Sequence, residues 1–233
     1  MRTEPAHNAS DLRSFRYLDK LIVVFVTVLL VSNIVAPKLV AVGPFLFSGA
    51  QLLFPITYIF GDVFTEVYGY AASRRAIWSG FFASALLSAL SAIIIALPPA
   101  PEWNGQAAYQ EVLGMTPRIF IASLAAYWAG EFANSFVLAR LKIATSGRYL
   151  WMRTIGSTMV GQAVDTAIVM TIAFAGIYSA ANIARLILSG YLFKVIYEAA
   201  ATPVTYMVVN TLKRREGADI LDTDTNFNPF ATG

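Results

Sequence analysis

Six long apolar stretches, separated by short polar segments, make up most of the chain. A helix needs about 20 mostly apolar residues to cross the hydrocarbon core of a bilayer, and each stretch, the second with a few following residues, is long enough. The pattern predicts an all-α membrane protein: a bundle of six transmembrane helices in residues 21–212, flanked by polar segments at residues 1–20 and 213–233. The expected spans are residues 21–37, 39–61, 76–101, 119–139, 154–184 and 186–212.

The composition favours a membrane protein over a soluble one. Hydrophobic residues make up 57% of the chain and charged residues 13%, and the mean hydropathy is +0.61. Soluble domains carry about 25% charged residues, and a soluble fold of this length has too little interior for so much apolar surface. The first stretch lacks a clear small-residue cleavage site, so we expect a retained helix and not a signal peptide.

The placement of the basic residues predicts the orientation of the bundle. With the N-terminus in the cytoplasm, thirteen of the 17 lysines and arginines fall in cytoplasmic segments. Three fall at the outer ends of the spans, namely Lys38, Arg118 and Arg185. Cytoplasmic loops carry the excess of Lys and Arg in membrane proteins. We therefore expect both termini in the cytoplasm.

Two segments outside the spans lead to further expectations. Residues 98–117 form the longest loop, either solvated or folded as a small extracellular cap, and we favour the solvated loop. The C-terminal segment is polar and acidic, a composition that predicts disorder. Tyr68 and Tyr70, close to the inner end of the second stretch, are expected in the aromatic belt at the membrane interface.

Four ionisable residues interrupt the last three apolar stretches: Glu131, Asp165, Lys194 and Glu198. At about 1.5 Å per residue, they lie roughly 14 to 20 Å from the surface at which each helix enters. In a hydrocarbon slab about 30 Å thick, these depths are close to the middle. A charge there costs roughly 2.5 to 3.5 kcal/mol on insertion scales and marks a functional site by default. The matching depths predict one shared central site.

Further polar residues lie on the same helix faces as these charges. Lys194 and Glu198 are four residues apart and could pair, while Gln162 precedes Asp165 by three and Asn134 follows Glu131 by three. An alternative is that these side chains only join the helices through hydrogen bonds worth about 0.6 kcal/mol each. We favour a solute or ion site, because packing rarely requires three buried carboxylates and a lysine.

The second stretch carries its own pair of acids, Asp62 and Glu66, four residues apart on one face. Like charges at this spacing repel unless a cation, a proton or a donor-rich solute lies between them. Glu66 could instead reach the interface, whereas the short Asp62 side chain lies too deep. Asn33 lies near the outer third of the first stretch. The candidate solute-binding residues are Asn33, Asp62, Glu66, Glu131, Asn134, Gln162, Asp165, Lys194 and Glu198.

Other chemistry is limited by the residues that the chain lacks. There is no cysteine and a single histidine, His7. Thiolate nucleophiles and thiolate metal sites are therefore excluded, and multi-histidine sites are not expected. An intramembrane enzyme would need a carboxylate dyad, whose usual signature is not evident. We expect no enzyme, cofactor, bound metal or nucleic-acid partner. The expected partners are a small solute and the lipid bilayer, and a homodimer stays open.

Several polar motifs along the chain form a recognisable set. The most specific is FPITYIFGDVFTEVYGY at residues 54–70. Others are SNIVAPK (32–38), EFANSFVLARLK (131–142), GQAVDT (161–166), residues 194–203 and the tail at residues 228–230. This set resembles the motifs of the queuosine precursor transporter family, once described as vitamin-uptake-like. The resemblance spans essentially the whole chain, and the motifs agree in order and in membrane depth.

The resemblance implies a bacterial inner-membrane protein that imports 7-deazaguanine precursors of queuosine, a modified tRNA base. It also implies a fold like the substrate-binding subunits of energy-coupling-factor transporters, working without their ATPase module. An alternative is a binding subunit that needs a separate ATPase complex. Buried carboxylates could accept the adjacent N–H donors of such a solute. Tyr58, Phe60 or Tyr127 could stack on its ring, although we expect each of them to serve in packing.

Overall fold

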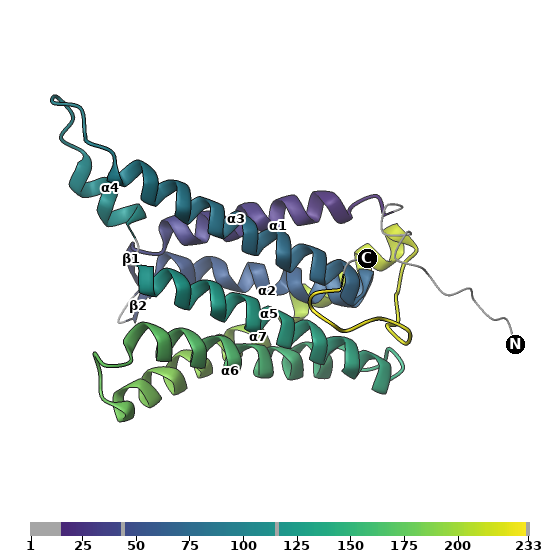
Figure 1. Ribbon diagram of the computed structural model, residues 1–233. Helices are drawn as coiled ribbons and strands as arrows, with labels where there is room; N and C mark the ends of the chain where they lie inside the picture. The colour runs from purple at the N-terminus through teal and green to yellow at the C-terminus, as the bar shows by residue number, and fades with distance from the viewer. Residues whose placement is uncertain (1–14, 43–44, 115–116, 232–233) are drawn as a thin grey trace, which may run out of the picture.

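The computed structural model describes residues 15–42, 45–114 and 117–231, which form a bundle of long helices (Figure 1). Six helices of 18 or more residues lie in these ranges. They are α1 (Leu18–Val35), α2 (Gly49–Tyr68), α3 (Tyr70–Ala96), α5 (Pro117–Ala144), α6 (Leu150–Phe174) and α7 (Ala180–Glu216). A short helix, α4 (Gln106–Leu113), and a hairpin of β1 (Leu39–Val42) and β2 (Phe45–Ser48) lie at one end of the bundle.

The outer surface of the bundle is apolar. On α3, Phe82, Leu86, Leu90 and Ile93 are each more than half exposed and follow one another at helical spacing. An exposed apolar stripe of this size marks an interaction surface, which for a helix of this length is lipid. In the described ranges, five helical segments are long and apolar enough to cross a membrane, and α2 is not among them. The chain is therefore a multi-pass membrane protein, and the exact count of six spans stays a prediction.

The second apolar stretch contains a hairpin that the sequence analysis missed. We expected a span from Leu39, but residues 39–42 pair with residues 45–48 as antiparallel strands, with Leu39 opposite Ser48, and α2 begins only at Gly49. β-branched and aromatic residues on either side of a Gly-Pro pair are a hairpin signal. Because both strands are apolar, hydropathy alone merges them with the helix that follows.

The fifth apolar stretch ends earlier than predicted. We expected a span to residue 184, but α6 ends at Phe174 and Gly176 has a φ of +79°. A left-handed glycine of this kind commonly ends a helix. The next helix, α7, begins at Ala180, with the Ser179 hydroxyl accepting a hydrogen bond from the Asn182 N–H at 3.4 Å. The long loop that follows the C-terminal end of α3 contains the short helix α4. No residue of α4 is buried, as expected of a solvated loop.

The C-terminal segment is ordered, contrary to the prediction from its composition. Residues 217–231, called the C-terminal strap below, cross the end of the bundle beside the start of α3 (Figure 1). Both carboxylate oxygens of Asp222 accept from the Tyr70 N–H at 3.0 Å. Arg74 donates to the carbonyls of Asn226 and Asn228, at 2.9 and 3.2 Å. An acidic segment becomes ordered here because α3, α5 and α7 supply donors for its carbonyls and carboxylates.

The tyrosines at the α2–α3 corner do not form an interfacial belt. Tyr68 and Tyr70 are each only 1% exposed. The Tyr68 hydroxyl donates to Glu216 at 2.9 Å, and the Tyr70 hydroxyl donates to the carbonyl of Phe227 at 3.1 Å. The expectation failed because the end of α7 and the strap supply acceptors at this corner that the sequence pattern does not reveal.

Candidate functional site

Polar side chains from four helices meet inside the bundle. We call this set the central cluster. It is almost completely buried, with exposed fractions between 0 and 6% for all of its members except Lys194, whose side chain is 22% exposed. Its members are Asp62 from α2, Glu131 and Asn134 from α5, Thr158, Gln162 and Asp165 from α6, and Lys194 and Glu198 from α7.

Glycines let the helices that carry the central cluster approach closely. A Cβ atom on Gly161 of α6 would lie 2.7 Å from the Cβ of Asn134, and one on Gly130 of α5 would lie 2.7 Å from the Cβ of Asp165. On α2, a Cβ on Gly61 would lie 3.0 Å from the Glu131 carboxylate. Small residues at such crossings are a common feature of membrane helix packing. They bring the polar groups of α2, α5 and α6 to one level.

A few hydrogen bonds within the central cluster orient its side chains. The Asn134 amide donates to Asp62 Oδ1 at 3.2 Å, which joins α5 to α2. Lys194 Nζ donates to Asp165 Oδ2 at 2.5 Å and to the Thr166 hydroxyl at 3.4 Å, which joins α7 to α6. The sequence suggested a Lys194–Glu198 pair along one helix, and the structure shows an ion pair between helices.

Most of the remaining oxygens in the central cluster have no hydrogen-bond partner within the described ranges. Leaving a buried polar atom unsatisfied costs about 1–3 kcal/mol, so a concentration of them calls for an explanation. A ligand that supplies hydrogen-bond donors would satisfy this array. The atoms are Asp62 Oδ2, Glu131 Oε2, Asn134 Oδ1, Thr158 Oγ1, Gln162 Oε1 and Glu198 Oε1.

The carboxyl groups of the central cluster are also close enough to repel one another. Glu131 interacts electrostatically with Asp165 and Glu198, and Asp62 does so with Glu198. Like charges in a low-dielectric interior are costly unless a proton or a cation offsets them. The cluster thus combines crowded carboxyl groups with acceptor oxygens that have no partner within the described ranges, which favours solutes that are rich in N–H groups or carry positive charge.

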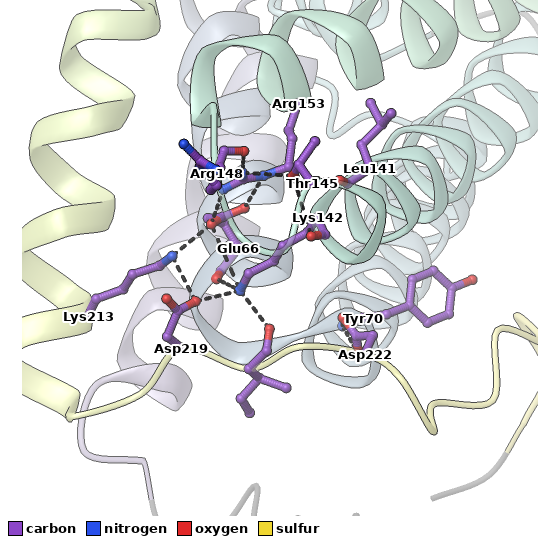
Figure 2. Close-up of polar contacts among 11 residues, drawn as sticks. Glu66, Tyr70, Leu141, Lys142, Thr145, Arg148, Arg153, Lys213, Asp219 and Asp222 are labelled. Carbon is purple, nitrogen blue, oxygen red and sulfur yellow. Dashed lines mark hydrogen bonds and ion pairs between the residues drawn. The ribbon is translucent and has the colours of Figure 1, made fainter. Parts of the chain in front are cut away.

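A second buried cluster lies closer to the strap, and here the charges are paired. We call it the Glu66 network: Glu66, Lys142, Arg153, Lys213 and Asp219. Figure 2 shows Arg153, Lys142 and Lys213 converging on Glu66 from different elements. Glu66 Oε1 lies 2.6 Å from Arg153 Nη2, 2.7 Å from Lys213 Nζ and 3.9 Å from Lys142 Nζ. Asp219 of the strap lies 2.7 Å from Lys142 and 2.8 Å from Lys213.

The structure brings together seven of the nine predicted site residues. Glu66 is not one of them, because its carboxylate is saturated by basic groups in its own network. Asn33 is the other exception: its amide donates to the Ser84 hydroxyl at 3.4 Å, on α3, which contributes nothing to the central cluster. A solute-binding role for any of the nine stays a prediction.

The partners of Glu66 were not predicted from the sequence. Lys142, Arg153 and Lys213 were counted only as cytoplasmic positive charges, yet Lys142 and Arg153 are each 1% exposed. A signal was available for these three residues, because each lies at the helix end that meets the same end of the bundle as Glu66. No comparable signal existed for Asp219, in a tail whose composition predicts disorder.

The three aromatic residues considered for stacking differ in their surroundings. Phe60 packs against Phe25 and Phe64, and the Tyr127 hydroxyl donates to the carbonyl of Ile77 on α3. Tyr58 is 5% exposed, hydrogen-bonds to the Gln162 side chain and lies near Asp165 and Glu131. Tyr127 also lies near Glu131, and of the two Tyr58 contacts more members of the central cluster.

Comparison with known proteins agrees with the polar motifs. The "Probable queuosine precursor transporter" of Bacillus subtilis (strain 168) is 34% identical over 146 residues, covering 62% of this chain and 64% of that protein. The chain thus spans just under two thirds of the length of this relative. The "Queuosine precursor transporter" of Escherichia coli (strain K12) is 26% identical over 166 residues, covering 70% of this chain and 72% of that protein. No solved structure matches the chain.

The region matched by a family model includes α2, α5 and α6, with their residues of both clusters, and most of α7. A family model described as "Putative vitamin uptake transporter" matches residues 48–208, well over half of the chain. The matched region contains every member of the central cluster. The chain therefore belongs to this vitamin uptake transporter family.

Proposed function

We propose that the chain imports a 7-deazaguanine precursor of queuosine across the bacterial inner membrane and binds it at the central cluster. The observation that carries the proposal is the set of buried oxygens on α2, α5, α6 and α7 that have no hydrogen-bond partner in the described part of the chain. Polar groups inside a membrane protein persist where they face a solute pathway. The names of the two relatives support this choice of solute.

The chemistry of the solute matches that of the central cluster. The pairing edge of a 7-deazaguanine presents adjacent N–H donors, and one carboxylate can accept two of them in charge-assisted hydrogen bonds. Asp62 Oδ2 on α2 and Glu131 Oε2 on α5 have no hydrogen-bond partner within the described ranges. In this proposal the Asn134 and Gln162 amides bind the remaining polar edge of the solute, and Tyr58 contacts its flat face.

The orientation follows from the distribution of basic residues. The end of the bundle that carries the strap also holds Arg74, Lys142, Arg153 and Lys213. The excess of positive charge lies on the cytoplasmic side of membrane proteins. In this proposal the strap end faces the cytoplasm, and the end with the hairpin and α4 faces outward.

The proposal is tested in bacteria that cannot synthesise the precursor. Cells receive nanomolar precursor, and queuosine in tRNA is measured with the native chain, without it, and with Glu131→Gln or Asp62→Asn. We expect queuosine only with the native chain and a loss of at least tenfold with either substitution. Asp19→Asn is the matched control, since Asp19 forms an exposed ion pair with Arg75 at 3.0 Å.

Two results would count against the proposal. Equal queuosine in all strains would rule out transport of this solute. Equal queuosine with the native chain and both site variants would keep transport and remove the site. Uptake by the purified chain alone in liposomes separates a complete carrier from a binding subunit that requires an ATPase complex.

A further inference from the structure

The two buried clusters involve the same four helices. The central cluster takes side chains from α2, α5, α6 and α7. The Glu66 network takes Glu66 from α2, Lys142 from α5, Arg153 from α6 and Lys213 from α7. On α2, Glu66 lies one helical turn beyond Asp62 toward the strap. The four helices that contribute to the central cluster are thus joined through Glu66, at a point between the cluster and the strap.

The Glu66 network fills the strap end of the bundle. Arg153, Lys142 and Glu66 are among the largest fully buried side chains of the described ranges. One carboxylate oxygen of Glu66 receives Arg153 and Lys213 at 2.6 and 2.7 Å, and the second receives the Arg153 Nε at 3.2 Å. Lys142 Nζ also donates to the Glu66 carbonyl at 2.6 Å. A solute moving from the central cluster toward the strap would meet these side chains first.

The strap completes this closure from outside. Asp219 bridges Lys142 and Lys213, and Lys142 donates to the Ile220 carbonyl at 2.6 Å. Partial burial raises the pKa of Asp219, but hydrogen bonds from Lys142 and Lys213 outweigh it and leave the pKa below its usual value. The strap carboxylate is therefore charged at neutral pH. Without it, three cations would share the single carboxylate of Glu66.

We propose that the Glu66 network and the strap are the inner gate of the transporter, closed in this structure. Opening requires Glu66 to release at least one of Arg153 and Lys213, so that α2 separates from α6 or α7. Asp219 favours the closed state by bridging α5 and α7. The inference rests on the proposed function only in that a solute must cross the bundle at the central cluster.

The test uses the natural absence of cysteine in the chain. Thr158→Cys places a single thiol in the central cluster, where Thr158 is 1% exposed. Inverted membrane vesicles present the strap end to a membrane-impermeant maleimide, and the labelling rate is measured without any solute. We expect slow labelling of this reporter and a rate at least tenfold higher when Glu66→Gln or Asp219→Asn is added. Asp19→Asn, which breaks the exposed pair with Arg75, should leave the rate unchanged.

The outcomes separate the gate from the solute. Labelling that is already fast in the reporter alone would mean that this end is open and would overturn the proposal. An unchanged rate in both gate variants would also overturn it, provided that the thiol reacts fully after denaturation. Asp219 is 56% exposed, so Asp219→Asn keeps the test decisive even if Glu66→Gln fails to fold. Faster labelling in the gate variants, together with no precursor uptake by the native chain, would support the gate and remove the proposed solute.

Discussion

Asp62 and Glu66 lie one helical turn apart on α2, both fully buried, yet their surroundings are opposite. Glu66 has two basic partners within 2.7 Å and a third at 3.9 Å. Asp62 has the Asn134 amide at 3.2 Å on one oxygen and no hydrogen-bond partner within the described ranges on the other. The comparison shows that burial of an acid does not identify its role. The partners do.

The difference in partners suggests separate roles for Asp62 and Glu66, which the sequence pattern does not distinguish. A buried carboxylate surrounded by cations is internally satisfied, and losing either side of such a pair is costly. A buried carboxylate with a free oxygen is satisfied only when a ligand or a proton arrives. A carboxylate surrounded by cations stabilises one conformation. A carboxylate with an unpaired oxygen can still accept a hydrogen bond from a ligand.

The largest expected effect comes from removing the charge of Glu66. Glu66→Gln removes the carboxylate that Arg153 contacts and leaves Lys142 and Lys213 with Asp219. Breaking a buried pair by removing one partner costs about 3–5 kcal/mol. We expect a marked loss of thermal stability of the purified protein in detergent. A melting temperature equal to that of the Asp19→Asn control would contradict the idea that the network holds the helices together.

Removing a carboxyl group from the central cluster should have the reverse profile. Glu131→Gln removes a repelling acid whose Oε2 has no partner within the described ranges, so stability should change by less than about 1 kcal/mol or increase. Uptake should fall at least tenfold. Melting temperature and queuosine formation are measured on the same variant. A loss of stability as large as that of Glu66→Gln would show that Glu131 has a structural role.

A smaller effect is expected where the strap lies against the α2–α3 corner. Gly69 has a φ of +82°, and a Cβ there would lie 2.9 Å from Ile220 Cγ2 and 3.1 Å from Asp222 Oδ1. Gly69→Ala should destabilise the protein by about 1–2 kcal/mol through backbone strain and displacement of the strap. Limited proteolysis of the tail reports on the displacement. Cleavage no faster than in the native chain would mean that the strap tolerates the side chain.

The smallest effect concerns pH. The folded pKa of Asp219 is lower than the value of about 3.9 for a free aspartate. The Asp219 carboxylate therefore stabilises the docked strap above that pH, and this contribution is lost as the pH falls through the lower folded pKa. Tail proteolysis should accelerate below about pH 4 in the native chain. In Asp219→Asn this step should be absent, and an identical pH profile in both proteins would disprove the role of Asp219.

The sequence was sufficient to predict the helical bundle and most of the central cluster, for physical reasons. Long apolar stretches in a bilayer leave few alternatives to helices. Intramembrane charges such as Glu131 and Asp165 must face inward, so their depths predicted that they would meet. Thr158, Gln162 and Asp165 share a helix face, and all three are buried.

The features that were missed depend on contacts between distant parts of the chain. The hairpin at residues 39–48 was hidden because strands and helices are equally apolar in a membrane protein. The strap is ordered only because its carbonyls meet Arg74, Trp78 and Lys142. Glu66 was placed in the solute site because spacing along α2 cannot reveal Arg153 on α6. Local patterns predicted the elements, and the pairing of charges between elements had to be observed.

Equilibrium binding to the purified chain tests the central claim most directly. A 7-deazaguanine precursor is titrated against the native protein, Glu131→Gln, Asp62→Asn and Asp19→Asn, and the bound fraction is measured. The account predicts saturable binding of one solute per chain to the native protein and to Asp19→Asn, and affinity at least tenfold weaker in the other two. Equal affinity in all four proteins would contradict the assignment of the solute to the central cluster.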